Sequence, residues 1–244
     1  HQFLRLEGLD QVVVGPGFQA LDPVGQNGVL GNIDNASRVN LKLVNSDLTH
    51  ATLDGINVVA QNGSTFNGTF VNSNVSNAGG DGLDLTLNNS TSHITFDNSD
   101  LANVGGDAIH VSGLNSTLGM NLSNGIALDN AVGDAMDFTG NNTDFTISAN
   151  GNVTATGAGG DALHVGVTNT SNFDADFRRS LTMGNAGDNA IDLSADNSIA
   201  NVFVRGASSG ANAGNDAIRI TGTTNSQATV QLFNAGSFAN AGGD

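Results

Sequence analysis

The chain has 244 residues and a formal net charge of −16 at pH 7, because 23 acidic residues stand against only 7 lysines and arginines. Phosphate contacts require basic side chains, so this balance argues against nucleic acid as a partner and against contact with an anionic membrane surface. Cysteine is absent, which excludes disulfide bonds and thiolate metal sites.

The first 26 residues differ in pattern from everything that follows. They contain both prolines of the chain, Pro16 and Pro23, and an apolar stretch from Val12 to Val14. The ends of repeat proteins carry atypical units that cover the hydrophobic core. We therefore predict that residues 1–26 form an N-terminal cap or an imperfect first coil, and that residues 27–244 form the repeat domain.

From residue 27 onward, one short motif returns at intervals of about 26 to 28 residues, and this fixed period predicts a solenoid. The motif is a glycine pair or its remnant, then Asp or Asn, a small residue, and two apolar residues that flank a polar one. Units open at Asn27, Asp54, Asp81, Asp107, Asp134, Asp161, Asn189 and Asp216. We expect about seven coils. Because Asp244 begins one more unit, we expect the chain to be truncated at the start of a further coil.

The apolar residues of the motif alternate with polar ones, which is the pattern of a half-buried β-strand. These pairs are Ile56 and Val58, Leu83 and Leu85, Ile109 and Val111, Met136 and Phe138, Leu163 and Val165, Ile191 and Leu193, Ile218 and Ile220. Three strands of about five residues with three turns account for about 27 residues. The predicted fold is all-β: a parallel β-helix with three short strands per coil, right-handed like nearly all parallel crossovers.

The turn residues of the motif have a structural interpretation of their own. Glycine allows backbone conformations or close approaches that a side chain would forbid. An Asp or Asn side chain accepts hydrogen bonds from turn N–H groups. Two of the eight units open with Asn, at Asn27 and Asn189, which favours this capping role. The alternative is a ligand role, such as calcium binding. The predicted turn ladder consists of Asp54, Asp81, Asp107, Asp134, Asp161, Asn189 and Asp216.

A second row of side chains occupies the polar position between the two apolar residues. It reads Asn57, Asp84, His110, Asp137, His164, Asp192 and Arg219. Carboxylates stacked about 5 Å apart would repel one another, and the interleaved basic residues turn that repulsion into attraction. We expect the neighbouring carboxylates to raise the pKa of His110 and His164.

This outward row has three interpretations. It is a surface charge ladder, a catalytic acid and base pair, or a divalent metal site. Imidazole and carboxylate suit zinc or similar ions, although no preset four-ligand spacing is visible. The metal candidates are Asp84, His110, Asp137, His164 and Asp192. The sequence indicates no dedicated cofactor beyond calcium or another divalent ion, and it names no catalytic residue.

The segments GGDGLDL, GGDAIHV, GDAMDF, GGDALHV and NDAIRI, with Asn-rich strands such as NSDL and NSNV, resemble the coils of bacterial surface right-handed β-helices. The similarity is to autotransporter and inverse-autotransporter adhesin passengers, and the pectate-lyase-like superfamily shares this architecture. Over residues 27–244 the resemblance implies an extracellular segment at the bacterial cell surface, anchored in the outer membrane through another part of the protein. The implied function is non-catalytic: an adhesin passenger, stalk or binding surface for a glycan or protein of a host or neighbouring cell.

Two alternative functions stay open from the sequence. One is a polysaccharide-acting lyase or hydrolase of the pectate-lyase-like type, which would need loops that rise off the sheet and a positioned Arg or Lys. The repeat period varies by only a residue or so, and Arg219 is the one basic residue of the outward row besides the histidines. The other alternative is a calcium-stiffened rod or fibre. An uncovered last coil would also offer a strand edge for end-to-end self-association.

Overall fold

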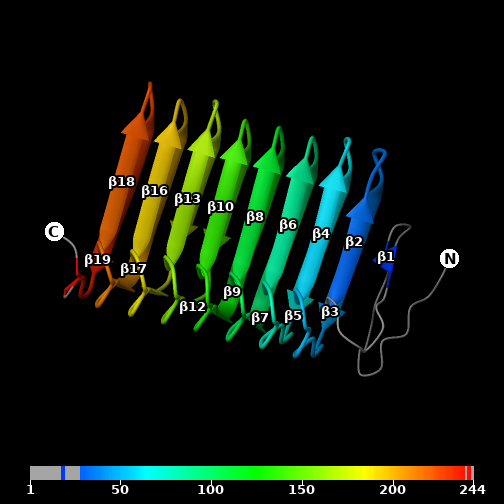
Figure 1. Cartoon of the computed structure of the whole chain (residues 1–244), viewed down its shortest axis with the longest axis horizontal. Coiled ribbons are helices and arrows are strands. Elements are labelled where there is room, and N and C mark those ends of the chain that lie inside the picture. Colours follow the sequence, from blue (N-terminus) through cyan, green and yellow to red (C-terminus); the bar gives the residue numbers. More distant parts are fainter. Residues whose placement is uncertain (1–17, 20–27, 240, 243–244) are drawn as a thin grey trace.

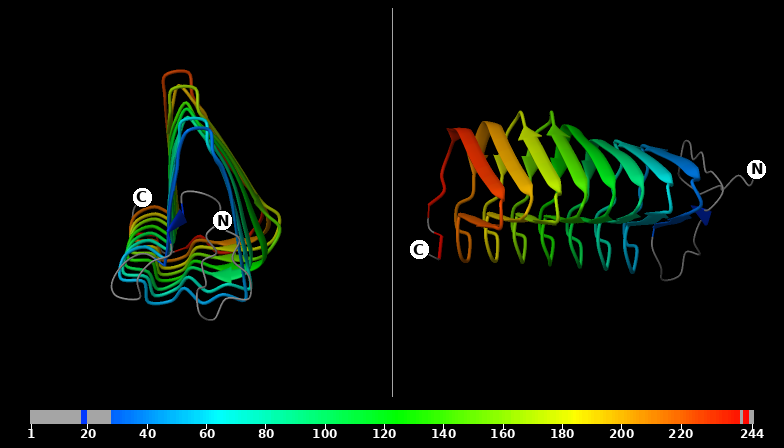
Figure 2. Two further views of the ribbon diagram at one scale, coloured as in Figure 1. Left: turned by 90° about the vertical axis from the view of Figure 1, so that its right-hand side faces the viewer. Right: turned by 90° about the horizontal axis from the view of Figure 1, so that it is seen from above.

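A computed structural model describes residues 18–19, 28–239 and 241–242, and in this part of the chain every regular element is a β-strand (Figure 1). The chain winds as a parallel β-solenoid, and each coil passes through two sheets in turn. Viewed from the end nearest residue 28, the chain rises through the first sheet on the left, crosses the upper turn and descends on the right, so it runs clockwise as it recedes (Figure 2). The coil is therefore right-handed, as expected from the sequence.

Sheet 1 holds the strand that follows each glycine motif. Its parallel strands are β2 (Val29–Ile33), β4 (Ile56–Gln61), β6 (Leu83–Asn88), β8 (Ile109–Leu114), β10 (Met136–Asn141), β13 (Leu163–Thr168), β16 (Ile191–Asp196) and β18 (Ile218–Thr223). Neighbouring strands pair without a register shift, so equivalent residues of successive coils lie side by side. These eight strands correspond to about eight turns, one more than expected, because each of the eight units that open between residues 27 and 216 contributes a strand.

Sheet 2 holds the second strand of each coil. Its main strands are β3 (Arg38–Val44), β5 (Thr65–Val71), β7 (Thr91–Asp100), β9 (Thr117–Ala127), β11 (Asp144–Ala149), β14 (Asn172–Phe177), β17 (Ile199–Ser209) and β19 (Gln227–Ala235). The third strand of the coil is short. It appears separately as β12 (Val153–Thr154) and β15 (Leu181–Thr182), and these pair with the ends of the longer strands β9 and β17. The predicted three strands per coil are therefore two full strands and one short one.

The end of the solenoid near β2 carries one antiparallel strand. β1 (Phe18–Gln19) pairs with β2, with Phe18 opposite Gly31. It covers part of the edge of sheet 1, as a cap would. The rest of the predicted cap lies outside the described residues, as do Asn27 and the motif remnant at Asp244, so the cap remains a prediction.

The upper turns, which follow the strands of sheet 1, account for much of the asparagine content. In the six turns that follow β4 to β16 an asparagine has a φ between 48° and 55°: Asn62, Asn89, Asn115, Asn142, Asn169 and Asn197. In the turns that follow β2 and β18, the φ values of Asn35 and Asn225 are 58° and 56°. Asparagine enters this left-handed region at a lower cost than most residues because its short polar side chain bonds locally. Stacked amides also bond between coils, as where Nδ2 of Asn142 donates to Oδ1 of Asn115 at 2.9 Å.

The predicted apolar pairs point into the space between the sheets. They are buried from Ile56 and Val58 through to Leu193, whereas Ile220 in the last coil is 47% exposed because no further described coil covers it. Phe138 of sheet 1 packs near Phe145 and Phe173 of sheet 2, with ring centroids 5.9 and 5.4 Å away. These aromatic contacts join the two sheets.

Candidate functional site

The opening residues of the repeat form a hydrogen-bonded ladder along the lower turns. In each step the side-chain oxygen Oδ1 of one coil accepts a hydrogen bond from the backbone N–H of the equivalent residue in the next coil. The donors and acceptors are Asp81 to Asp54 (2.9 Å), Asp107 to Asp81 (2.7 Å), Asp134 to Asp107 (2.6 Å), Asp161 to Asp134 (2.6 Å), Asn189 to Asp161 (2.7 Å) and Asp216 to Asn189 (3.0 Å). The side chain therefore accepts a hydrogen bond from the neighbouring coil rather than from its own turn.

The glycines before these residues leave room for the ladder. A Cβ on Gly160 would lie 2.1 Å from Oδ1 of Asp134. The other glycine of the pair abuts backbone, since a Cβ on Gly159 would lie 2.1 Å from the carbonyl oxygen of Val132. Of the two roles expected for the glycine pair, close approach is the one that the structure requires here.

Replacing Asp134 by Ala should lower the free energy of unfolding by about 1–3 kcal/mol, because the backbone N–H of Asp161 then loses its acceptor in a partly buried turn. Asp134→Asn should cost much less, since Asn189 fills the same place in the ladder with an amide oxygen. Chemical denaturation of the two variants measures the difference. Equal losses in both variants would mean that the charge, not the hydrogen bond, stabilises the turn.

The outward row stacks in register on the outer face of sheet 1, and its N-terminal half forms a continuous polar network. Nδ2 of Asn57 donates to Oδ2 of Asp54 at 2.8 Å and to Oδ2 of Asp84 at 2.9 Å. His110 lies beside Asp84 and Asp137 in the parallel pairing. Its Nδ1 is 3.5 Å from Oδ1 of Asp84, and its Nε2 is 3.8 Å from Oδ2 of Asp137.

The C-terminal half of the row forms a second group. Nδ1 of His164 is 3.7 Å from Oδ2 of Asp192, and Nη1 of Arg219 is 3.5 Å from the same oxygen. The alternation of acid and base along the row therefore produces ion pairs between coils. All five metal candidates named from the sequence take part in these ion-pair contacts along the row.

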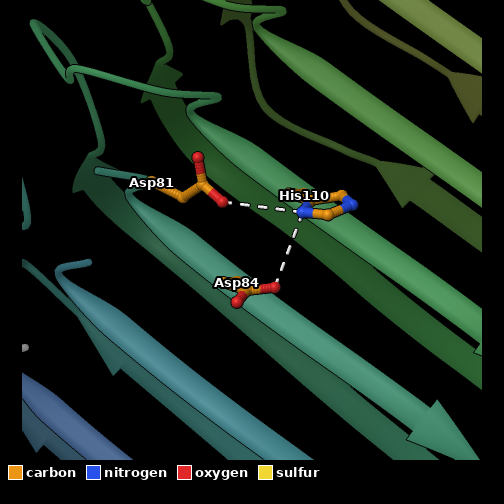
Figure 3. Close-up of side chains that lie close together, drawn as sticks. All are labelled: Asp81, Asp84 and His110. Atoms are coloured by element: carbon orange, nitrogen blue, oxygen red, sulfur yellow. Dashed lines mark ion pairs between the residues drawn. The ribbon is translucent and has the colours of Figure 1, made fainter. Parts of the chain in front are cut away.

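The turn ladder and the outward row form one surface, which the sequence analysis treated as two separate features. Oδ2 of Asp81 lies 3.5 Å from Nδ1 of His110 (Figure 3), and Oδ2 of Asp161 lies 3.2 Å from Nδ1 of His164. Asp81 and Asp161 thus use one oxygen for the ladder and the other for an imidazole. For Asp161 and His164 the spacing Asp-x-x-His carried this signal, but residues three apart face opposite sides of a straight strand, so the turn geometry was needed to interpret it. Asp81 and His110 belong to successive coils.

Side chains that can ligate a metal gather at two places on this surface. Within each group the ligand atoms lie within 4.8 Å of one another, and the groups are Asp81, Asp84 and His110, and Asp134, Asp161 and His164. Asp137 and Asp192 stand outside both groups as the structure describes them. Each group instead includes carboxylates of the turn ladder: Asp81 in the first, and Asp134 and Asp161 in the second.

Carboxylates raise the pKa of both imidazoles, in the direction expected from the sequence. The carboxylate of Asp81 is the main cause for His110, and that of Asp161 for His164; each pKa rises to about 9. Burial in turn raises the pKa of Asp134 to about 6. For Asp161, burial opposes ionisation, yet hydrogen bonds from His164 and Asn189 hold its pKa below the usual value.

The raised histidine pKa values predict that stability falls as the pH rises from about 6.5 to about 9. A histidine whose pKa rises on folding contributes its full stabilisation below the unfolded value of 6.5 and loses it as the pH passes through the folded value. Because the imidazoles are about 30% exposed, solvent screens the pairs, and we expect roughly 1–2 kcal/mol for both together. Thermal melts across this pH range, with chelator present, check this. The double variant His110→Asn, His164→Asn should show a weaker dependence of stability on pH. An unchanged pH profile in that double variant would contradict the assignment.

Two shallow hollows lie on the face of sheet 1, one over the C-terminal part of the outward row and one beside the row. One, of about 550 Å³, is polar and mostly acidic; it is lined by Asp134, Asp161, His164, Asp188, Asn189, Asp192, Asn215, Asp216 and Arg219. The other, of about 430 Å³, lies toward the ends of the strands; its exposed surface is mainly apolar, and its lining includes Thr86, Ser112 and Thr139. The face thus offers a strip of charge beside a mainly apolar strip that carries neutral polar groups.

No protein-family model, no curated protein and no solved structure matches this chain. The fold and the candidate site are therefore inferred from the residues of this chain alone. In the part of the chain that the structure describes, no helix is long and apolar enough to cross a membrane.

Proposed function

We propose that this chain is an extracellular, non-catalytic segment of a bacterial surface protein, and that the outer face of sheet 1 binds a glycan or protein of a neighbouring cell. The observation that carries the proposal is the uniformity of sheet 1. Its strands from β2 to β18 pair in parallel without a register shift, so their outward side chains form one continuous face. A flat polar face suits a broad binding surface better than an enclosed reaction site.

The chemistry of the face supports the same function. The hollow of about 430 Å³ combines a mainly apolar surface with the polar side chains of Thr86, Ser112 and Thr139 and of Asn88 and Asn141. Such groups both donate and accept hydrogen bonds, as sugar hydroxyls and peptide groups require. The net charge of −16 favours partners that are neutral or positively charged. The proposed location outside the cell follows the resemblance to surface β-helices.

The experiment compares two sets of alanine substitutions in the full chain. The test variant replaces Thr86, Ser112 and Thr139 on sheet 1. The control replaces threonines on sheet 2 that are also outside the core, namely Thr69, Thr95 and Thr146. Binding to a glycan array and to surface proteins of intact cells is measured for both. We expect about a tenfold loss of affinity in the test variant alone, which is the loss of roughly one net hydrogen bond.

Two results would contradict this function. One is binding to the arrays and cells that is equally strong in the wild type, test and control proteins, because the partner would then contact another surface. The other is turnover: release of new reducing ends or unsaturated products from a panel of neutral and acidic polysaccharides would make the chain an enzyme.

A further inference from the structure

The group around His110 has the geometry of a metal site (Figure 3). Nδ1 of His110 lies 3.5 Å from Oδ2 of Asp81 and 3.5 Å from Oδ1 of Asp84. The two carboxylates come from the turn before β6 and from β6 itself, and the imidazole comes from the next strand, β8. All three side chains are partly exposed, at 19%, 26% and 31%, so one side of the group is open to solvent.

These distances suit a shared cation better than direct hydrogen bonds. A separation of 3.5 Å is at the upper limit for a hydrogen bond from a ring nitrogen. Ligands about 2.0–2.1 Å from a tetrahedral zinc ion lie about 3.3–3.4 Å from one another, which is close to the two observed separations. All three ligand atoms lie within 4.8 Å of one another, so the two carboxylates would need to move toward each other only as far as side-chain rotation allows for an ion to bind all three groups.

Further contacts orient each ligand from its far side. Oδ1 of Asp81 accepts a hydrogen bond from the backbone N–H of Asp107 at 2.7 Å, so that Oδ2 faces the imidazole. Oδ2 of Asp84 accepts from Nδ2 of Asn57 at 2.9 Å, which leaves Oδ1 toward the imidazole.

The imidazole also has a partner on its far side, and this observation is independent of the three ligand atoms. Nε2 of His110 faces Oδ2 of Asp137 at 3.8 Å. A histidine that ligates a metal commonly donates its other ring N–H to a carboxylate, which fixes the tautomer and the ring orientation. At 3.8 Å the separation is longer than a hydrogen bond, so Asp137 would have to approach by several tenths of an ångström to accept this N–H. The other oxygen of Asp137, Oδ1, is buried and has no hydrogen-bond partner.

We propose that Asp81, Asp84 and His110 bind a transition metal ion of the zinc class, with Asp137 as the residue that positions the imidazole. The ligand set decides between ions. Calcium takes six to eight oxygen ligands, whereas an imidazole with two carboxylates suits zinc, nickel or copper. Three protein ligands leave at least one coordination position open on the solvent side. The same residue types meet again two coils further on, at Asp134, Asp161 and His164.

The test is a calorimetric titration of the chelator-treated full chain with zinc chloride, and separately with calcium chloride. We expect saturable zinc binding and much weaker calcium binding. His110→Asn should remove one equivalent of zinc; asparagine already occupies this position of the row at Asn57, so the variant should fold. Asp137→Asn should weaken the same equivalent by about 10–100-fold.

His93→Asn is the matched control. His93 lies on β7 of sheet 2, outside both groups of metal-ligating side chains, and its replacement should leave zinc binding unchanged. Circular dichroism of each variant confirms that it retains the β-sheet spectrum. The proposal would be overturned if the wild type bound no zinc, or if His110→Asn bound as many equivalents with the same affinity as the wild type.

Discussion

Phe173→Ala should lower the free energy of unfolding by about 3–5 kcal/mol, the largest effect that we expect from a single substitution. Phe173 is fully buried on β14, and its ring centroid lies 5.4 Å from that of Phe138 and 6.0 Å from that of Phe145. Alanine would leave a cavity where the two sheets meet. The lost contacts also connect neighbouring coils, on which a repeat protein depends for its stability.

Phe233→Ala is the matched control for this substitution. The Phe233 side chain is 55% exposed, and its ring stacks under the guanidinium of Arg205, 5.3 Å from the centroid. Its removal should cost less than about 1 kcal/mol. Guanidinium denaturation of both variants gives the comparison. Equal shifts of the denaturation midpoint would mean that Phe173 is not part of a packed core.

Gly159→Ala should lower the free energy of unfolding by about 1–3 kcal/mol or more, although Gly159 is exposed to solvent. The added Cβ would lie 2.1 Å from the carbonyl oxygen of Val132 in the preceding coil. Because the obstacle is backbone, it cannot rotate away as a side chain would. The coils would have to separate locally, which stretches the hydrogen bond from the N–H of Gly159 to the carbonyl of Ala131, now 2.9 Å.

Gly166→Ala distinguishes this mechanism from a general intolerance of alanine. Gly166 lies inside β13, and a Cβ there would be 3.6 Å from Nε2 of His164 and 3.8 Å from Cγ2 of Thr139, which are ordinary contacts. Alanine should be neutral or slightly stabilising at this position, since glycine weakens a strand interior. If thermal melts showed the same loss for both variants, contact between coils would not be the reason for the paired glycines.

The fold was accessible from the sequence because a parallel solenoid repeats its environment. One alternation, Leu163 and Val165, predicts the inward face of every coil once the period is known, and the parallel register then places His110 between Asp84 and Asp137. Ile220 is exposed, unlike its equivalents, because no further described coil covers it.

The candidate site was accessible only in part. The outward row follows from strand alternation, but the approach of Asp81 to His110 depends on the path of the turn, which the alternation does not describe. The backbone N–H group that donates each hydrogen bond of the turn ladder could not be predicted from the sequence either. A side-chain oxygen that serves the next coil, as Oδ1 of Asp134 serves the N–H of Asp161, is a contact across 27 residues. Local sequence patterns predict contacts within a turn more readily than contacts between turns.

The central claim is that each turn residue holds the next coil in place and thereby fixes the polar face of sheet 1. Amide hydrogen exchange at Asp161 tests it most directly, because this N–H donates to Oδ1 of Asp134 at 2.6 Å. We predict a protected amide in the wild type and in Asp134→Asn, and exchange faster by about 5- to 100-fold in Asp134→Ala. Exchange at Asp161 that is the same in Asp134→Ala as in the wild type would contradict the account.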